Sequence, residues 1–202
     1  KDLSIPADIS SAAFFLIAAA CLRGSELRIS NVGLNPTRKA VLDILLQFGA
    51  EINVENERTV CNEPVGDMIV RSGERIRLGG SRNELHGDVI ANLIDELSIL
   101  AVLGTQLEGG LEIRDAGELR VKESDRIASI VGNLRRMGAD VEEFDDGFRV
   151  AQSRLKGTVV DSFGDHRIAM AFAVAALFAE GETEIRGAES ADISFPGFFE
   201  TL

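Results

Sequence analysis

Three helical segments that are apolar on almost every side constrain the fold of this 202-residue chain most strongly. They cover residues 10–22, 95–107 and 165–179, and they consist mostly of Ala, Leu, Ile, Val and Phe. A helix that is apolar all round has no face to turn towards water, so it is expected in a protein interior. The segments between the three helices must therefore supply strands and amphipathic helices that cover them.

These intervening segments repeat in a fixed order. Each cycle is expected to run strand, buried helix, strand, amphipathic helix and two further strands, over roughly 70 to 85 residues. The matching landmarks are strand triplets at 27–29, 111–113 and 183–185, and helix ends at 48–50 and 137–139. Repeats that bury one another's apolar faces predict one pseudo-symmetric α/β domain over residues 1–202. Its cycles cover about 1–80, 81–155 and 156–202, and the last is incomplete.

Periodicity predicts the elements around the apolar helices. One amphipathic helix is expected after a Thr37 cap and another after a Ser124 cap. A final helix is expected from Ser194, with Pro196 in its first turn. Hairpins are expected around 55–57 and 145–146, and further strands at 27–32, 68–70, 76–78, 85–90, 111–115, 158–160 and 183–186.

Composition narrows the function classes. A net charge of -12 argues against a nucleic-acid or anionic membrane partner. No apolar run reaches the roughly 18 residues of a membrane span, and no signal peptide is visible. Cys21 and Cys61 lack a metal-binding spacing, and Cys21 is expected to be buried, which fits a reduced, cytoplasmic setting. Because the chain begins at Lys1 rather than Met, it is expected to be a processed piece or a fragment.

Several cations occupy the helix end that favours them least. Lys122 and Arg126, together with Arg120, crowd the start of the second amphipathic helix, and Arg167 opens the third apolar helix. A helix N-terminus carries about half a positive charge, so a cation there is mildly unfavourable. A bound anion would remove the conflict, because N–H groups, dipole and side chains would all point at it. A solvated helix start with neighbouring acids also explains the first cluster.

Polar residues open all three buried helices, at 8–11, at 92 and 95–96, and at 164–167. If the pseudo-symmetry keeps the helices parallel, their positive poles emerge at one end, which would attract anions. Taken singly, Asp95 and Asp165 are also explained as N-caps or first-turn acids, and His166 as a structural residue. Arg167 needs a partner anion, for which Asp165 is one candidate. Two arginines beside carboxylates at converging helix starts indicate an anionic substrate that undergoes proton transfer.

Four motifs together resemble the family of 5-enolpyruvylshikimate-3-phosphate synthases. They are Asp-Ile-Ser-Ser-Ala at 8–12, Lys-Glu-Ser-Asp-Arg at 122–126, Gly-Asp-His-Arg-Ile-Ala-Met at 164–170 and Ser-Phe-Pro-Gly-Phe-Phe at 194–199. The match is specific because the motifs span nearly the whole chain in order. It implies two similar inside-out α/β barrels of three repeats, with the active site between them. This chain would be most of the barrel that contains the C-terminus, without its partner domain and a short N-terminal segment.

The resemblance also implies a reaction. The family transfers the enolpyruvyl group of phosphoenolpyruvate to the 5-hydroxyl of shikimate 3-phosphate and releases phosphate, in the shikimate pathway to aromatic amino acids. The reaction is an addition followed by an elimination, without metal or organic cofactor. By resemblance, Asp95 binds the sugar hydroxyls and accepts a proton, while Glu123 joins proton transfer at the phosphoenolpyruvate methylene.

The remaining roles concern the anionic groups of the substrates. By resemblance, Lys122 contacts shikimate 3-phosphate or the nearby anionic centre. Arg126 and Arg167 hold phosphoenolpyruvate, since arginine forks suit bidentate anion binding. Asp165 and His166 would orient that end of the site.

One departure and two alternatives accompany the resemblance. Many family members carry a lysine shortly before the C-terminal Phe-Pro, where this chain has Asp192 or Ile193, so that role is not carried over. Other substrate ligands belong to the missing part, so this chain would hold about half of the site and be inactive alone. The alternatives are an enolpyruvyl transferase acting on UDP-N-acetylglucosamine, which the 122–126 and 164–167 motifs disfavour, and a non-catalytic anion-binding module.

Overall fold

A computed structural model describes residues 3–73 and 83–202. The chain divides into two compact units, unit 1 from Lys1 to Arg77 and unit 2 from Leu78 to Leu202. Both are mixed α/β, as the sequence predicts. The strand expected at 76–78 lies outside the described residues. Within the described ranges, no helix is both long and apolar enough to cross a membrane.

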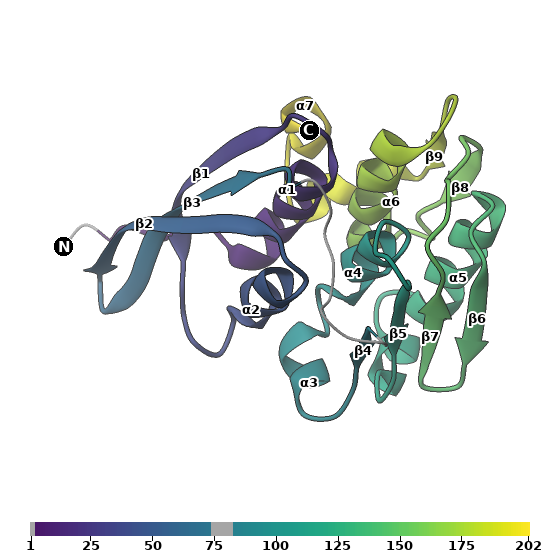
Figure 1. Cartoon of the computed structure of the whole chain (residues 1–202), viewed down its shortest axis with the longest axis horizontal. Coiled ribbons are helices and arrows are strands. Elements are labelled where there is room, and N and C mark those ends of the chain that lie inside the picture. The colour runs from purple at the N-terminus through teal and green to yellow at the C-terminus, as the bar shows by residue number, and fades with distance from the viewer. Residues whose placement is uncertain (1–2, 74–82) are drawn as a thin grey trace. The chain divides into compact units, whose positions relative to one another are not determined.

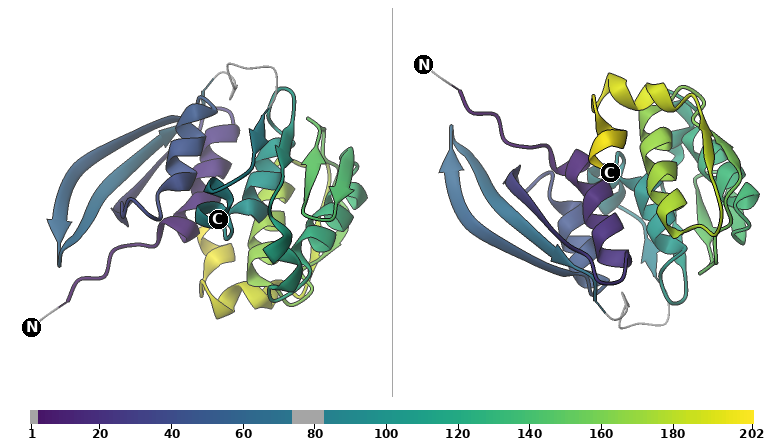
Figure 2. Two further views of the ribbon diagram at one scale, coloured as in Figure 1. Left: turned by 90° about the horizontal axis from the view of Figure 1, so that it is seen from below. Right: turned by 90° about the horizontal axis from the view of Figure 1, so that it is seen from above.

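Unit 1 is a three-stranded antiparallel sheet with two helices on one face (Figures 1 and 2). The strand order is β1 (Glu26–Gly33), β3 (Glu63–Arg71) and β2 (Glu51–Val60). The helices are α1 (Ile9–Cys21) and α2 (Ala40–Gln47). Both contribute apolar side chains to the core, and α1 packs on β1 and β3. The sheet and α2 therefore give α1 the cover that its sequence requires.

Helix α1 is the first of the buried helices that the sequence predicts. Ten of its thirteen residues are buried. Its polar start is a cap, because the Asp8 carboxylate accepts the amide hydrogen of Ser11 at 2.9 Å. At its other end, burial raises the pKa of the Cys21 thiol to about 12, as expected of a cysteine that packs as a small apolar residue.

Two expectations for unit 1 are wrong. Thr37 does not cap α2; its hydroxyl donates to Asn35 Oδ1 at 2.9 Å, in a turn before the helix. The predicted hairpin around 55–57 is instead a bulge within the continuous strand β2, where Asn56 has a φ of 53°. The chain reverses at Cys61 and Asn62, whose φ values of 51° and 69° give the turn twist that two-residue hairpins favour.

A buried carboxylate fastens the bulges in β1 and β2. Asp67 on β3 accepts hydrogen bonds from the Asn31 amide at 2.8 Å, Asn56 Nδ2 at 2.9 Å and Arg28 Nη2 at 2.8 Å. These bonds hold the pKa of Asp67 well below its usual range. The carboxylate therefore stays ionised and fixes the sheet at the point where both outer strands change register.

Unit 2 places three helices against two sheets. The four-stranded sheet has the order β4 (Glu84–Leu85), β5 (Leu111–Ile113), β7 (Gly147–Val150) and β6 (Val141–Phe144), and β8 (Val159–Asp161) pairs with β9 (Glu184–Arg186). The helices are α4 (Leu97–Gly104), α5 (Arg126–Arg136) and α6 (His166–Phe178), and each contacts the other two. Gly104 allows α4 to lie close to the sheet, since an added Cβ would sit 2.4 Å from Val150 Cγ1.

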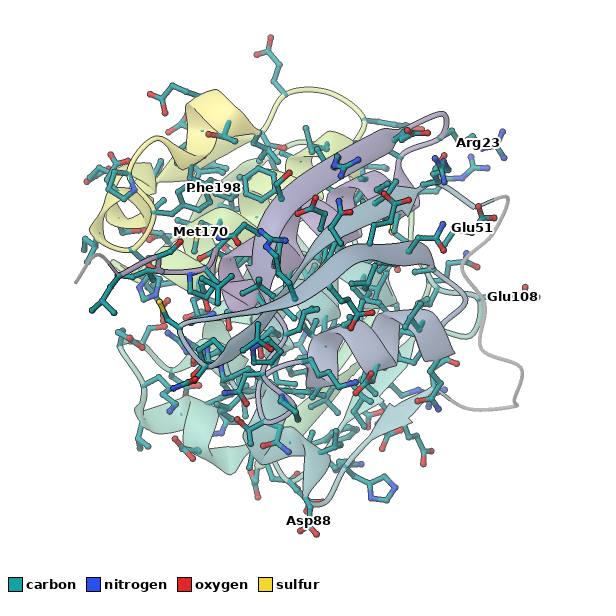
Figure 3. The ribbon with its side chains drawn as sticks, turned by 90° about the vertical axis from the view of Figure 1, so that its left-hand side faces the viewer. Arg23, Glu51, Asp88, Glu108, Met170 and Phe198 are labelled. Atoms are coloured by element: carbon teal, nitrogen blue, oxygen red, sulfur yellow. The ribbon has the colours of Figure 1, made fainter. Side chains whose placement is uncertain are left out.

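Four short elements differ from the sequence expectation. The strand expected at 85–90 ends at Leu85, because Gly87 turns the chain with a φ of 71°, and α3 (Val89–Leu93) follows. No helix begins at Ser194: a 3₁₀ helix, η2 (Ala188–Ile193), ends just before it, and α7 (Phe198–Thr201) begins four residues after it. Pro196 precedes α7, which begins after Gly197 at a φ of 78°. Phe198, labelled in Figure 3, is nevertheless fully buried. It packs edge-on against Phe195, with 5.6 Å between the ring centroids.

Strand pairing shows the repeat in the connectivity of each unit. A parallel bridge joins Ala7 to Val32 across α1, and parallel pairs β4–β5 and β8–β9 flank α4 and α6. Each buried helix is thus the crossover between two parallel strands. The hairpins β2–β3 and β6–β7 follow α2 and α5, and in both the second strand pairs with the strand before the amphipathic helix.

Candidate active site

The start of α5 differs by one residue from the sequence expectation. Asp125, not Ser124, is the N-cap, and its carboxylate accepts the amide hydrogen of Ala128 at 3.0 Å. The Ser124 hydroxyl instead donates to Asp165 Oδ2 at 3.1 Å. Because the cap falls one residue later, Arg126 becomes the first residue of the helix. Its side chain therefore begins at the positive pole, where an anionic partner is most favourable.

A strained turn sets the start of α6. Phe163 and Gly164 both have left-handed backbone angles, with φ of 53° and 72°. For a bulky residue such as Phe163 this is unusual, and such strain persists only where surrounding contacts enforce it. Asp161 Oδ1 accepts the Phe163 amide hydrogen at 2.7 Å, which fixes the turn. Asp165 then caps α6 by accepting the amide hydrogen of Arg167 at 2.9 Å, as predicted.

A buried ion pair joins these two helix starts. Arg126 Nε lies 2.7 Å from Asp165 Oδ2, and its Nη2 lies 3.3 Å from Oδ1, so the guanidinium grips both carboxylate oxygens. The Arg126 side chain is 2% exposed and that of Asp165 is 0% exposed. Burial alone would raise the pKa of Asp165, but the hydrogen bonds and charge of Arg126, with the Arg167 amide, hold it below its ordinary value. Asp165 therefore stays a carboxylate.

Asp95 bridges both arginines. Its Oδ2 lies 3.2 Å from Arg167 Nη2, its backbone oxygen accepts from Arg167 Nη1 at 2.8 Å, and its Oδ1 lies 3.8 Å from Arg126 Nη1. The partner of the Arg167 guanidinium is thus Asp95 rather than Asp165, which was the candidate from sequence. Asp95 is also not a cap, because it lies in the turn between α3 and α4, and α4 begins at Leu97.

Two acids of the cluster, Glu123 and Asp95, reach solvent, whereas Arg126 does not. Glu123 Oε2 lies 2.5 Å from Arg126 Nη2, and the Glu123 side chain is 51% exposed. Asp95 is 35% exposed and Arg167 is 14% exposed. Carboxylates in this position can contact a bound molecule and exchange protons with it. The buried Arg126–Asp165 pair holds these carboxylates in a fixed position.

His166 and Lys122 complete the set of residues singled out from sequence. Burial and the charge of Arg167 lower the pKa of His166, so its imidazole is neutral at neutral pH and can donate and accept hydrogen bonds. The Lys122 ammonium forms an ion pair with Glu118, one helical turn earlier. Glu118 is not among the residues predicted from the sequence, although the Glu-x-x-x-Lys spacing could have indicated it. Ile193 is 78% exposed, so an apolar side chain reaches solvent at the departure from the family pattern.

The site and the fold define an α/β protein built from repeated strand–helix units, with an arginine–carboxylate cluster at two helix starts. The family model described as EPSP synthase (3-phosphoshikimate 1-carboxyvinyltransferase) matches residues 1–202. The chain therefore belongs to the EPSP synthase family, as its motifs indicate.

Individual relatives agree with this assignment. The 3-phosphoshikimate 1-carboxyvinyltransferase of a Synechocystis strain is 55% identical over 199 residues, which is 98% of this chain and 43% of that protein. The protein of the same name from Solibacter usitatus is 50% identical over 203 residues, or 100% of this chain and 46% of the relative. The chain thus spans less than half the length of the curated relatives it matches.

Solved structures show the same fold. An EPSP synthase from Acinetobacter baumannii superposes with a TM-score of 0.92 at 37% identity, over 98% of this chain and 45% of that one. The enolpyruvyl transferase NikO from Streptomyces tendae has a TM-score of 0.74 at 18% identity, covering 100% of this chain and 43% of that chain. The second likeness concerns the fold alone.

Proposed function

We propose that this chain carries about half of an active site that transfers the enolpyruvyl group of phosphoenolpyruvate to the 5-hydroxyl of shikimate 3-phosphate, releasing phosphate. The observation that carries the proposal is the convergence of Arg126 and Arg167 on Asp95, from the starts of two helices. Family membership and the names of the relatives support the choice of reaction. The chain would form most of one inside-out α/β barrel, with cycles at about 1–80, 81–155 and 156–202.

The two arginines would bind phosphoenolpyruvate. Both lie at helix N-termini, where backbone amides and the dipole add to the positive charge of the side chain. Asp95 and Glu123 pair with their guanidinium groups, so a bound phosphate or carboxylate would take over some of these contacts. Lys122, once released from Glu118, would contact shikimate 3-phosphate. Asp165 and His166 would hold the orientation of this end.

Charge balance supports a half-site. The three cations Arg126, Arg167 and Lys122 pair with four carboxylates, those of Asp95, Glu118, Glu123 and Asp165. Such a cluster does not attract an anionic substrate strongly by itself. Further cations from a complementary domain or chain of the same enzyme would supply the missing attraction.

Proton transfer would fall to the two exposed acids. Asp95 would accept the proton of the shikimate 5-hydroxyl, and Glu123 would exchange a proton with the phosphoenolpyruvate methylene. Positioned acids and bases of this kind contribute about a hundredfold to ten-thousandfold to a rate. The partial exposure of both side chains is compatible with direct contact to substrate.

The proposal is tested by restoring the missing half and varying the acceptor. The chain is mixed with a separately expressed segment holding the residues that a full-length relative has and this chain lacks. Phosphate release from phosphoenolpyruvate is then followed with shikimate 3-phosphate and with UDP-N-acetylglucosamine. Turnover is expected with the first acceptor, and turnover only with the second would contradict the proposed substrate. Binding of phosphoenolpyruvate without any turnover would favour the non-catalytic anion-binding module, which the partial length of the chain makes the second candidate.

A variant pair tests the role of Asp95. Asp95→Asn keeps the shape but removes the base, so turnover should fall about a hundredfold or more with little loss of folding stability. Asp88→Asn is the matched control, because Asp88 precedes α3 and projects from unit 2 in Figure 3. A rate unaffected by Asp95→Asn would remove Asp95 from the proposed chemistry.

A further inference from the structure

The side chain of Arg120 binds the β6–β7 hairpin. Its Nε donates to the backbone oxygen of Asp145 at 2.7 Å, and its Nη2 donates to the backbone oxygen of Phe144 at 2.6 Å. Nη2 also lies 3.1 Å from Glu143 Oε1. Arg120 thus lies at the start of α5, as the sequence predicts, because its Nη1 is also 3.0 Å from the Asp125 cap. Its guanidinium is engaged by the hairpin and by this cap.

The same guanidinium also binds the cap of α5. Arg120 Nη1 lies 3.0 Å from Asp125 Oδ2 and 3.3 Å from Oδ1, while Asp125 Oδ1 accepts the amide hydrogen of Ala128 at 3.0 Å. Arg120 and Asp125 bracket residues 121–124. One side chain thus holds both ends of the segment that carries Lys122 and Glu123, and it ties that segment to the sheet.

This segment has little apolar anchoring of its own. Val121 is 80% exposed, and the Glu123 side chain is 51% exposed. Leu119 is fully buried, but it lies before the segment and anchors only the chain that leads into it. The polar contacts of Arg120 therefore restrain the backbone between Leu119 and the first turn of α5, beside the bonds of Ser124 to Asp165 and of Glu123 to Arg126.

We infer that Arg120 is a positioning residue of the proposed reaction, which sets Lys122 and Glu123 against the Arg126–Asp165 pair by clamping both ends of residues 121–124. The inference rests on the proposed function for its catalytic consequence. A misplacement of a reacting group by about 1 Å can cost about a hundredfold in rate. Loss of the clamp should therefore lower turnover, with Arg120 acting through the position of Lys122 and Glu123.

The test compares two arginines that bind the same hairpin. Arg114, directly after β5, stacks on Phe144, with 3.3 Å from Cζ to the ring centroid, and its Nη1 lies 3.6 Å from Asp146 Oδ1. Arg114→Ala thus weakens the hairpin contact without touching residues 121–124. Arg120→Ala removes both the hairpin contact and the clamp.

Two readouts are taken for each variant. The first is amide hydrogen exchange of residues 121–126 in the 202-residue chain, which does not depend on activity. The second is kcat and KM in the restored enzyme, with and without added ethylguanidinium. For Arg120→Ala we expect faster exchange in this segment, a fall in kcat of about tenfold to a hundredfold, and partial rescue by ethylguanidinium. Arg114→Ala should change neither exchange in this segment nor kcat by more than about twofold.

The outcomes distinguish failure of the clamp on residues 121–124 from failure of the proposed function. Unchanged exchange at 121–126 in Arg120→Ala overturns the clamp, whether or not the parent is active. Faster exchange with unchanged kcat overturns the positioning role. A parent enzyme without turnover overturns the proposed function, while the exchange measurement still decides whether Arg120 holds the segment.

Discussion

Helices α1 and α6 occupy the same position in the repeat, and both begin with an aspartate cap. The two caps differ in their exposure to solvent and in the arginine that each one contacts. Asp8 accepts the amide hydrogen at the start of α1 and is 52% exposed, with Arg38 at 3.6 Å. Asp165 accepts the amide hydrogen of Arg167 at the start of α6, is fully buried and binds Arg126 at 2.7 Å. The repeat alone thus requires only a capped buried helix. A site arises where the neighbouring helix start supplies an arginine and the cap is covered.

The largest expected difference is in folding stability. Asp165→Ala leaves the guanidinium of Arg126 buried without its main partner, which costs about 3–5 kcal/mol. Asp8→Ala removes an exposed cap, which costs about 1 kcal/mol. Urea unfolding of the two variants and the parent measures both values. Equal decreases in the free energy of unfolding would mean that the two caps contribute equally to stability.

Arginine variants should show the same contrast in catalysis. In the restored enzyme, Arg126→Ala and Arg167→Ala should each lose about 2–5 kcal/mol of transition-state stabilisation, measured as kcat/KM for phosphoenolpyruvate. Arg38→Ala, which removes the arginine beside the exposed cap of α1, should stay within about twofold of the parent. Near-normal turnover of both cluster variants at low phosphoenolpyruvate would show that these arginines are structural.

The pH dependence of the unfolding free energy should show whether the buried cap Asp165 is ionised. The folded-state pKa of Asp165 lies below its ordinary value of 3.8, so its stabilisation is present above that value and is lost as the pH falls through the lowered pKa. Asp165→Asn keeps a capping oxygen but has no carboxylate to protonate. The unfolding free energies of parent and variant should therefore differ most near neutral pH and converge in acid. A difference that does not change with pH would contradict the ionised pair.

The sequence predicts the buried helices well because an apolar helix has only one stable environment. It also predicts the cap at Asp165, since that residue directly precedes the apolar run. It does not predict the partners of the arginines. The choice between Asp95 and Asp165 as the partner of Arg167 depends on how α4 and α6 pack, and no local pattern records that contact. The family motifs placed these residues in one site, while the pairings needed the fold.

The errors share a physical origin as well. The hairpin expected at 55–57 is a bulge because Asp67, distant in sequence, holds Asn56 in place. Asp125 rather than Ser124 is the N-cap, because the Ser124 hydroxyl donates to Asp165 and Arg120 holds the Asp125 carboxylate in place. In each case a tertiary contact overrides a local preference, which is how propensity-based expectations commonly fail.

The half-site itself is tested most directly by assaying the 202-residue chain alone and after mixing with the missing half. With one part of the site absent, the relative orientation of the reactants is lost, which alone can be worth roughly 7 kcal/mol or more. The chain alone should fold, bind phosphoenolpyruvate and shikimate 3-phosphate weakly at best and show no measurable phosphate release, and mixing should restore turnover. Full turnover by the purified chain, with mass spectrometry excluding a second polypeptide, would contradict the account.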